Sequence, residues 1–448
     1  MNLIKSINHK YLLFTALLYL ILLPRLDFQF LSIYLVSILS FISYYFVLQS
    51  QLFKSEQFYT KKRLLQIVFF YGLFYITTFN ILSYVYNDNF FVFSEADAGT
   101  YHVESLKMIS KTFSEGIDCF LSEYSFEDLG AVLVISTLYR VIESNLFVNV
   151  FYLLLSLYTG VGIFKIGQHL MPNKFSFLSA LTFSISSFYL WFNSSGLKES
   201  VLVFLVIQCF LNYYNFIKLR KPKHIVYLIL FLLSLMLFRP AIMFLIIGAM
   251  ALGILLSRRK NVAGIFLSII LFAIIVFAGS YITFILNKFM GGDIDQMIAG
   301  KESEGMIKGG VIFTYLVNTI AGLIGPFPTL LPNEKTLLSF YAPGLIYKIF
   351  ISIPFLFGIV YVFIKKKFIY YPIALFVLLE MSSLVFILEA LELRKSLPHF
   401  PFIYLISFGF ISSYASGEIN KKRRKSIITI FNFSFIIIFF LILYWNYR

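Results

Sequence analysis

The sequence predicts an all-α, polytopic integral membrane protein with about 13 transmembrane helices and amphipathic helices on its outer face. Composition gives the first reason: 59% of the 448 residues are hydrophobic, 13% are charged and the mean hydropathy is +0.85, whereas a soluble domain carries about 25% charged residues. Apolar runs of about 20 residues, long enough to cross about 30 Å of hydrocarbon as helices, also recur along the chain. We therefore expect a single transmembrane domain, residues 1–448.

The charge pattern between the apolar runs gives the third reason. The expected spans are 11–25, 27–49, 65–86, 145–165, 174–193, 198–217, 224–239, 241–257, 263–287, 345–364, 368–389, 398–416 and 426–445. With the N-terminus inside, clusters of lysine and arginine fall in the cytoplasmic connections at 61–63, 218–223, 258–260, 365–367 and 421–425. This agrees with the positive-inside rule and predicts a multi-pass protein of the cytoplasmic (inner) membrane.

One apolar segment breaks the alternation. Residues 310–332 are hydrophobic enough to cross the membrane, but a crossing would move the lysines at 365–367 outside. We therefore expect a re-entrant or interfacial helix pair, broken at Gly325, Pro326 and Pro328, within a second outer loop at 288–344.

The distribution of charge indicates that chemistry takes place outside. A net charge of +15 would suggest nucleic acid as a partner of a soluble protein, but here the cytoplasmic connections account for it, so no nucleic acid is expected. Only Glu56 and Glu418 of the 22 acidic residues fall in those connections. The two cysteines, Cys119 and Cys209, cannot form a disulfide framework or a cysteine metal site.

The first long outer loop, 87–144, contains the stretch SEADAGTYHVES. From Asp97 onward, apolar residues recur at helical spacing, which predicts an amphipathic helix in the headgroup region. That helix would hold Glu95 and Asp97 at the membrane surface. Alternatively, Ser94 and Asp97 only cap the helix start, and the two roles can coexist. The stretch 131–143 is too short to span and is expected along the outer surface.

Two turns between outer helix ends supply further charges. NSSGLKES, 193–200, places Lys198 and Glu199 at a helix start, where they would bind phosphate or order the first loop; an ordinary turn with a favourable first-turn acid is the alternative. Arg239, in LFRPA, precedes a helix that begins with Pro240. An arginine at that depth is expected to have an anionic partner, or else to reach lipid phosphate by snorkelling.

The third region, EALELRKSLPHFP at 389–401, is expected to bring Glu392, Arg394, Lys395 and His399 to the same outer face. A mixed-charge interfacial anchor is the alternative interpretation.

Metal ligands are sparse on the outer side. Asp293 and Asp295 form a D-x-D pair in a glycine-rich loop and are weak candidates for a divalent metal. Only His102 and His399 are expected outside, which does not support a zinc site. No other cofactor is indicated.

Transfer of a sugar from a lipid phosphate requires a surface carboxylate, several outer cations and a large apolar body, and the sequence offers all three. When polyprenyl phosphate leaves the sugar, cations must stabilise its negative charge, and the attacking hydroxyl needs a base to accept its proton. Asp97 would be that base, with Arg239, Arg394 and Lys198 as phosphate clamps.

The same segments carry a family resemblance. ADAGTYHVESLKM, 96–108, resembles the first-loop signature of the GT-C superfamily of membrane glycosyltransferases, among them mannosyltransferases that use dolichyl-phosphate mannose. NSSGLKES and LRKSLPHFPFIYLISFG are similar to later segments of those enzymes. The resemblance implies an inverting glycosyltransferase with a polyprenyl-phosphate-linked sugar donor and a glycan acceptor, active in cell-surface polysaccharide or glycoconjugate assembly. It implies that Asp97 is the catalytic base, with Glu95 as its neighbour.

The substrate-binding candidates are Tyr101, His102, Lys198, Glu199, Arg239, Arg394 and His399. Membrane lipid is the other expected partner, and the oligomeric state is left open. Two other functions remain as alternatives. A Wzy-like polymerase of O-antigen or capsule repeat units would rely on Arg239 and Arg394, and a lipid or solute transporter would rely on the midspan acid Glu380.

Overall fold

The structure, a computed structural model, describes residues 2–52, 54–88, 97–257, 301–303, 310–331 and 338–447. The long elements in these ranges are all helices, and no strand occurs among the described residues. They are α1 (Asn2–Leu22), α2 (Leu31–Leu52), α3 (Lys61–Asn87), α4 (Asp97–Ile109), α5 (Phe113–Glu123), α6 (Phe126–Tyr139), α7 (Asn145–Leu170), α8 (Asn173–Ser184), α9 (Ser187–Ser194), α10 (Glu199–Leu219), α11 (Lys223–Met236), α12 (Pro240–Leu256), α16 (Val311–Leu323), α17 (Ala342–Ile364), α18 (Tyr371–Phe386), α19 (Leu393–Ser396), α20 (Phe400–Ser416) and α21 (Lys421–Tyr447).

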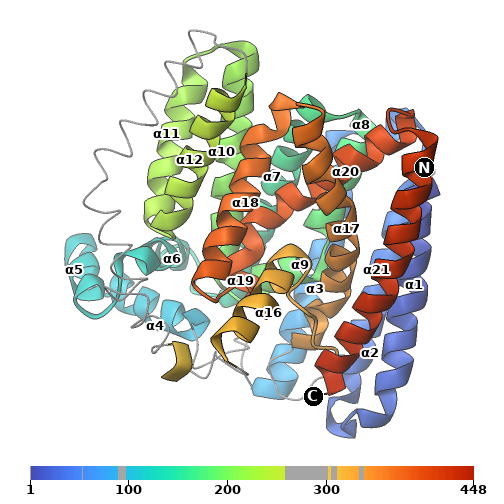
Figure 1. Cartoon of the computed structure of the whole chain (residues 1–448). Coiled ribbons are helices and arrows are strands. Elements are labelled where there is room, and N and C mark those ends of the chain that lie inside the picture. Colours follow the sequence, from blue (N-terminus) through green and yellow to red (C-terminus); the bar gives the residue numbers. More distant parts are fainter. Residues whose placement is uncertain are drawn as a thin grey trace.

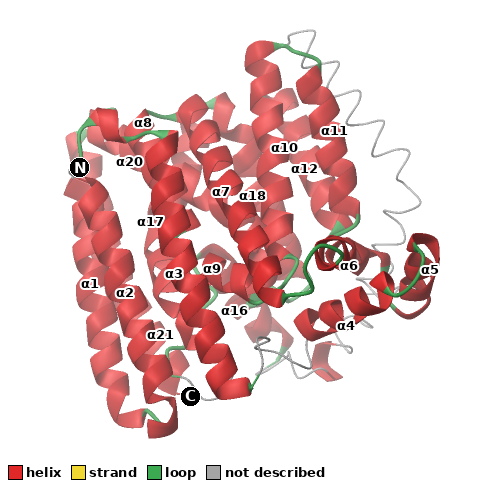
Figure 2. Ribbon diagram, turned by 180° about the vertical axis from the view of Figure 1, so that it is seen from behind, coloured by secondary structure: helices red, strands yellow, loops and turns green. Residues whose placement is uncertain are grey.

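The helices alternate in direction, so their connections gather at two ends (Figure 1). At one end, Lys174 donates to the carbonyl of Leu52 (3.0 Å) and Tyr370 donates to that of Leu170 (3.0 Å). We call this the basic end, because the lysine and arginine clusters at 61–63, 218–223, 365–367 and 421–425 lie there. Helices α4, α5, α6, α16 and α19 lie at the opposite end, as both views show (Figures 1 and 2).

Eight helices of the described residues are long and apolar enough to cross a membrane, and a ninth crossing results if α8 and α9, bent by 48°, form one broken span. These helices support a multi-pass membrane protein. Helices α11, α12 and α16 are apolar but shorter. The span expected at 263–287 lies outside the described residues, so the number of about 13 spans is not confirmed and stays a prediction.

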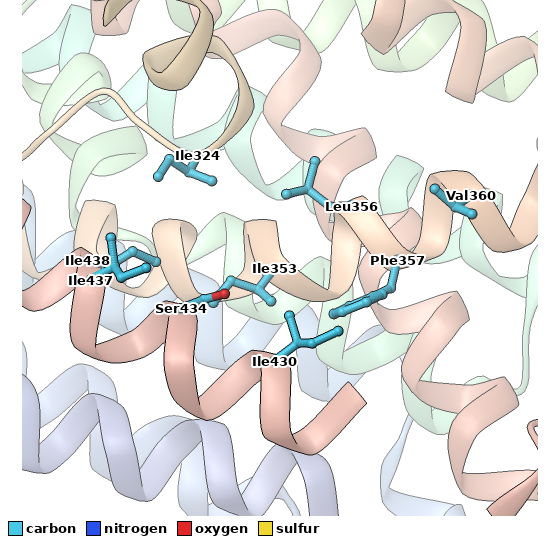
Figure 3. Close-up of a pocket in the computed structure, with 9 residues that line it drawn as sticks. All are labelled: Ile324, Ile353, Leu356, Phe357, Val360, Ile430, Ser434, Ile437 and Ile438. Carbon is cyan, nitrogen blue, oxygen red and sulfur yellow. The ribbon is translucent and has the colours of Figure 1, made fainter. Parts of the chain in front are cut away.

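Helix α20 occupies the centre of the bundle. All its residues from Phe400 to Tyr414 are buried, against α8, α17 and α18 among others. Helix α21 follows it in sequence yet lies at the periphery. Between α21 and α17 an apolar groove of about 400 Å³ remains, in which Ser434 is the one polar side chain among the lining residues (Figure 3). This lining suits lipid hydrocarbon.

The segment 310–331 forms one helix, α16, followed by non-helical chain from Gly325 onward. The expected helix pair is therefore wrong in its second member, because Pro326 and Pro328 remove the backbone donors that a helix would need. Lys348, fully buried in α17, donates to the carbonyls of Ile324 and Gly325 that follow α16. Unpaired carbonyls at a helix C-terminus attract a cation, which accounts for a lysine in this apolar helix.

Candidate functional site

Charged side chains from distant parts of the chain converge at the end opposite the basic end. They come from the starts of α4, α6, α10 and α12 and from α19 with the residue before it (Figure 1). We call the group the charged cluster. Its members are Asp97, Asp128, Lys198, Glu199, Arg239, Glu392 and Arg394.

Asp97 is the accessible carboxylate of the cluster. It is the first residue of α4, where the sequence predicts a helix start, and its side chain is 46% exposed. Arg394 donates directly to Asp97 Oδ2 through Nη1, and its Nε lies 3.4 Å from Glu392 Oε2. An arginine has five donors in a fixed fork, so Arg394 retains capacity for a further anion while it holds Asp97.

Glu199 and Arg239 form a deeper pair. Glu199 begins α10 and is only 2% exposed, and Arg239 is the residue immediately before α12. Arg239 Nη2 lies 3.6 Å from Glu199 Oε1, while Glu199 Oε2 has no hydrogen-bond partner among the described residues. Arg239 therefore has the anionic partner expected of it, and this pair joins the α9–α10 turn to the α11–α12 turn.

Lys198 orders the first outer loop. Its Nζ lies 2.6 Å from Asp128 Oδ1 and 3.0 Å from the carbonyl oxygen of Glu127, both at the start of α6. Tyr101 of α4 donates to the same Asp128 oxygen (2.7 Å). Lys198 is thus occupied by protein groups and not available as a phosphate clamp. Sequence reasoning missed Asp128; the signal was an acidic residue in the first turn of a short helix, EDLG, after Ser125.

Local backbone features fix these positions. Gly196 adopts a positive φ of 75° in the α9–α10 turn, a conformation that glycine adopts at little cost. Gly130 of α6 donates its N–H to the carbonyl of Leu237 (2.9 Å), and a Cβ at Gly130 would lie 2.7 Å from that oxygen. Only glycine permits this approach, which places the start of α6 beside Arg239 in the α11–α12 turn.

The carboxylates of the cluster control the ionisation of their neighbours. Burial of the guanidinium lowers the pKa of Arg394, but the nearby carboxylates of Glu199 and Asp97 outweigh this and raise it above its ordinary value. Burial raises the pKa of Asp128, but Lys198 outweighs it and the pKa is lowered. The pKa of Tyr101 is raised by burial and by Asp128, so its hydroxyl stays protonated as a donor.

The two histidines expected in the site lie elsewhere. His102 Nδ1 is 2.7 Å from the hydroxyl of Tyr139 in α6, and burial lowers the pKa of this imidazole. His399, expected on the outer face, lies in the turn between α19 and α20 and is 1% exposed, so its side chain is buried. It faces inward because an imidazole beside the apolar start of α20 packs against Glu380, whose Oε2 lies 3.5 Å from His399 Nδ1.

Neither Glu380 nor His399 has a hydrogen-bonding partner for its side chain among the described residues. Glu380 lies on α18, within two turns of the end of that helix at Phe386. Lys395, the remaining cation of α19, lies 2.7 Å from Glu389, which also accepts from Lys301 (2.9 Å). Lys395 also lies 3.4 Å from Glu392, so these ion pairs join the charged cluster through Glu392.

Three predicted residues cannot be placed. Glu95, Asp293 and Asp295 lie outside the described residues. Within the described ranges, no group of three or more histidine, cysteine, aspartate or glutamate side chains could hold a metal ion.

No protein-family model, curated protein or solved structure matches the chain. The charged cluster itself must therefore carry the functional argument. It combines an exposed carboxylate, which can accept a proton, with guanidinium groups that can bind an oxyanion, next to the ends of membrane-length helices.

Proposed function

We propose that this protein is a GT-C-like membrane glycosyltransferase that moves a sugar from a polyprenyl-phosphate-linked donor to a glycan acceptor. The observation that carries the proposal is the contact of exposed Asp97 with Arg394, with the Glu199–Arg239 pair alongside. By the positive-inside rule, the cluster faces the outside of the cytoplasmic membrane. A bundle of about 13 spans is part of the same proposal.

The proposed reaction needs one base and one cationic site. Asp97 takes the proton of the acceptor hydroxyl, whose oxygen forms a bond to the anomeric carbon of the donor sugar. The bond between that carbon and the phosphate oxygen breaks, and polyprenyl phosphate leaves with the electron pair. Its negative charge is stabilised by Arg394, which keeps free donors while it holds Asp97. The proton then passes from Asp97 to water.

The other residues position this pair. Arg239 supplies a second cation at the floor of the cluster, where it is paired with Glu199. Lys198, Asp128 and Tyr101 tie α4 and α6 to the bundle and so set the position of Asp97 at the start of α4. His102 and His399 are not assigned to substrate.

Complementation of a host that lacks the protein tests the proposal. Asp97→Asn should leave a lipid-linked glycan that lacks one sugar, detected by mass spectrometry, at normal membrane levels of the variant. Asp118→Asn is the matched control, because Asp118 is an exposed acid of α5 in the same loop. A complete glycan in the Asp97→Asn strain would overturn the assignment.

The Wzy-like polymerase remains the second candidate, favoured by the two arginines near Glu199. The same analysis separates the two functions. Complete but unpolymerised repeat units in Arg239→Ala and Arg394→Ala strains would indicate a polymerase, whereas units that lack one sugar would indicate a single-sugar transferase. The transporter is less well supported, because Glu380 is buried against His399 and 2% exposed.

A further inference from the structure

A polar cavity lies at the basic end, at the opposite end of the helices from the charged cluster. It has a volume of about 610 Å³ and lies among the ends of α7, α10 and α12 and the turn before α18. Its polar lining includes Gln168, His169, Lys218, Arg220 and Ser257, and none of the described residues that line it is acidic. This described lining therefore carries a net positive charge.

The walls of this cavity are held by specific contacts. His169 stacks on Tyr214 with ring centroids 5.9 Å apart, and its Nε2 lies 3.3 Å from Asn215 Oδ1. Tyr214 donates to the carbonyl of Ile369 (2.7 Å), which fixes the turn before α18 against α10. The cavity is thus preformed, and a ligand would not need to reorganise it.

Two cations line this cavity, and both side chains are exposed. Neither Lys218 nor Arg220 forms a hydrogen bond or ion pair through its side chain within the part of the chain that the structure describes. Arg220 ends α10 in the left-handed conformation, at a φ of 53°, which is uncommon for a residue other than glycine. Both side chains border one shared space, in which a single anion can contact them together.

The apolar part of the lining identifies the kind of anion. Ile217 and Ile369 line the cavity and are 43% and 47% exposed, so the opening is bordered by side chains suited to hydrocarbon. Lys218 and Arg220 lie at the level of the other basic connections, where headgroups of the adjacent leaflet are expected. A ligand that matches both the cationic and the apolar part of this lining has a phosphate group and an acyl chain.

We propose that this cavity binds the headgroup phosphate of an anionic phospholipid at Lys218 and Arg220, with an acyl chain along Ile217 and Ile369. The site is independent of the proposed transferase activity. It gives the protein a specific lipid at the membrane face opposite the charged cluster.

Native mass spectrometry of the full-length protein in detergent tests this site by titration with phosphatidylglycerol. The variant Lys218→Gln/Arg220→Gln should bind the lipid about thirtyfold more weakly. Each lysine or arginine near an anionic headgroup contributes about 1 kcal/mol to the binding free energy, and the loss of two such contributions corresponds to that fold-change. The matched control is Lys221→Gln/Lys223→Gln, which removes two exposed charges of the same connection that do not line the cavity. The control should bind as the wild type does.

Three results would overturn the proposal. The first is unchanged affinity in the Lys218→Gln/Arg220→Gln variant. The second is an equal loss in the control variant, which would mean that general attraction to the basic end accounts for binding. The third is displacement of phosphatidylglycerol by an equal concentration of inorganic phosphate, which would assign the site to free phosphate. Retention of the lipid against phosphate, with weaker binding of phosphatidylcholine, supports the phospholipid.

Discussion

Arg394 donates a hydrogen bond to Asp97 across 297 residues of sequence. Asp97 begins the first helix of the outer loop, and Arg394 lies on the one-turn helix before the central helix α20. Two further ion pairs, Lys198–Asp128 and Arg239–Glu199, close the same end of the bundle. The site and the closure of the helix ends are therefore built from the same contacts.

The contact between Asp97 and Arg394 predicts coupled losses of activity. Arg394→Ala should lower the rate of sugar transfer by about 100-fold or more, because it removes a donor for the leaving phosphate. Arg394→Lys should recover only part of the lost transfer rate, because an ammonium group lacks the bidentate fork of a guanidinium. Asp97→Asn combined with Arg394→Ala should be no slower than the slower single variant. Transfer rates in membranes check this, with Arg140→Ala, an exposed arginine after α6, as control. Additive losses would contradict a shared step.

Lys198 is expected to matter for stability more than for chemistry. Lys198→Met leaves Asp128 without its cation and should lower the free energy of unfolding by about 1.5–3 kcal/mol. The side chain is 10% exposed, so water replaces little of the lost contact. Thermal unfolding in detergent measures the change, and Lys221→Met, at an exposed lysine in the connection between α10 and α11, is the control. A normal unfolding temperature with lost activity would instead return Lys198 to the substrate site.

Gly130 provides a test of position without a change of charge. Gly130→Ala places a methyl group 2.7 Å from the carbonyl oxygen of Leu237 and should displace α6, at a cost of about 1–3 kcal/mol. Transfer should fall as well, because Asp128 and Arg239 move apart. Gly248→Ala is the control, since its Cβ would meet nothing within 4 Å. Equal unfolding temperatures of the two variants would show that α6 tolerates the shift.

The ion pair of Asp128 predicts a pH dependence of stability. Its folded-state pKa lies below the unfolded value of about 3.9, so its contribution is complete above about pH 5 and is lost as the pH falls through the unfolded and then the lowered folded pKa. The unfolding temperatures of wild type and Asp128→Asn should therefore differ by a constant amount from pH 7 to pH 5 and converge in stronger acid. A difference that already shrinks between pH 7 and pH 5 would assign the effect to another group.

We expect the buried pair of Glu380 and His399 to affect stability but not sugar transfer. Glu380→Gln keeps the shape and removes a costly buried carboxyl group, so the unfolding temperature should be at or above that of the wild type. Sugar transfer should continue in this variant. Glu380→Ala should be less stable than Glu380→Gln because it leaves a cavity. Substrate uptake into vesicles that depends on Glu380 and not on Asp97 would favour the transporter.

Local signals in the sequence predicted the helix starts of the site correctly. Asp97, Glu199 and Pro240 each begin a helix, because an acid in the first turn complements the helix dipole and proline suits the first helical position. The pairing of these starts with distant partners could not be predicted, since no local pattern links Arg394 to Asp97. The burial of His399 could not be predicted either: the mixed charges of residues 392–395 indicate an exposed segment, but His399 is enclosed by the bundle.

The central place of α20 has a consequence for biosynthesis. The helices that surround it, α8, α17 and α18 among them, precede it in the chain and leave the translocon earlier. Until residues 400–416 emerge, the faces of these helices that pack on α20 lack their partner. Arg394 emerges immediately before α20, so the step that completes this packing also delivers the partner of Asp97. Nascent chains that stop short of residue 394 would lack both.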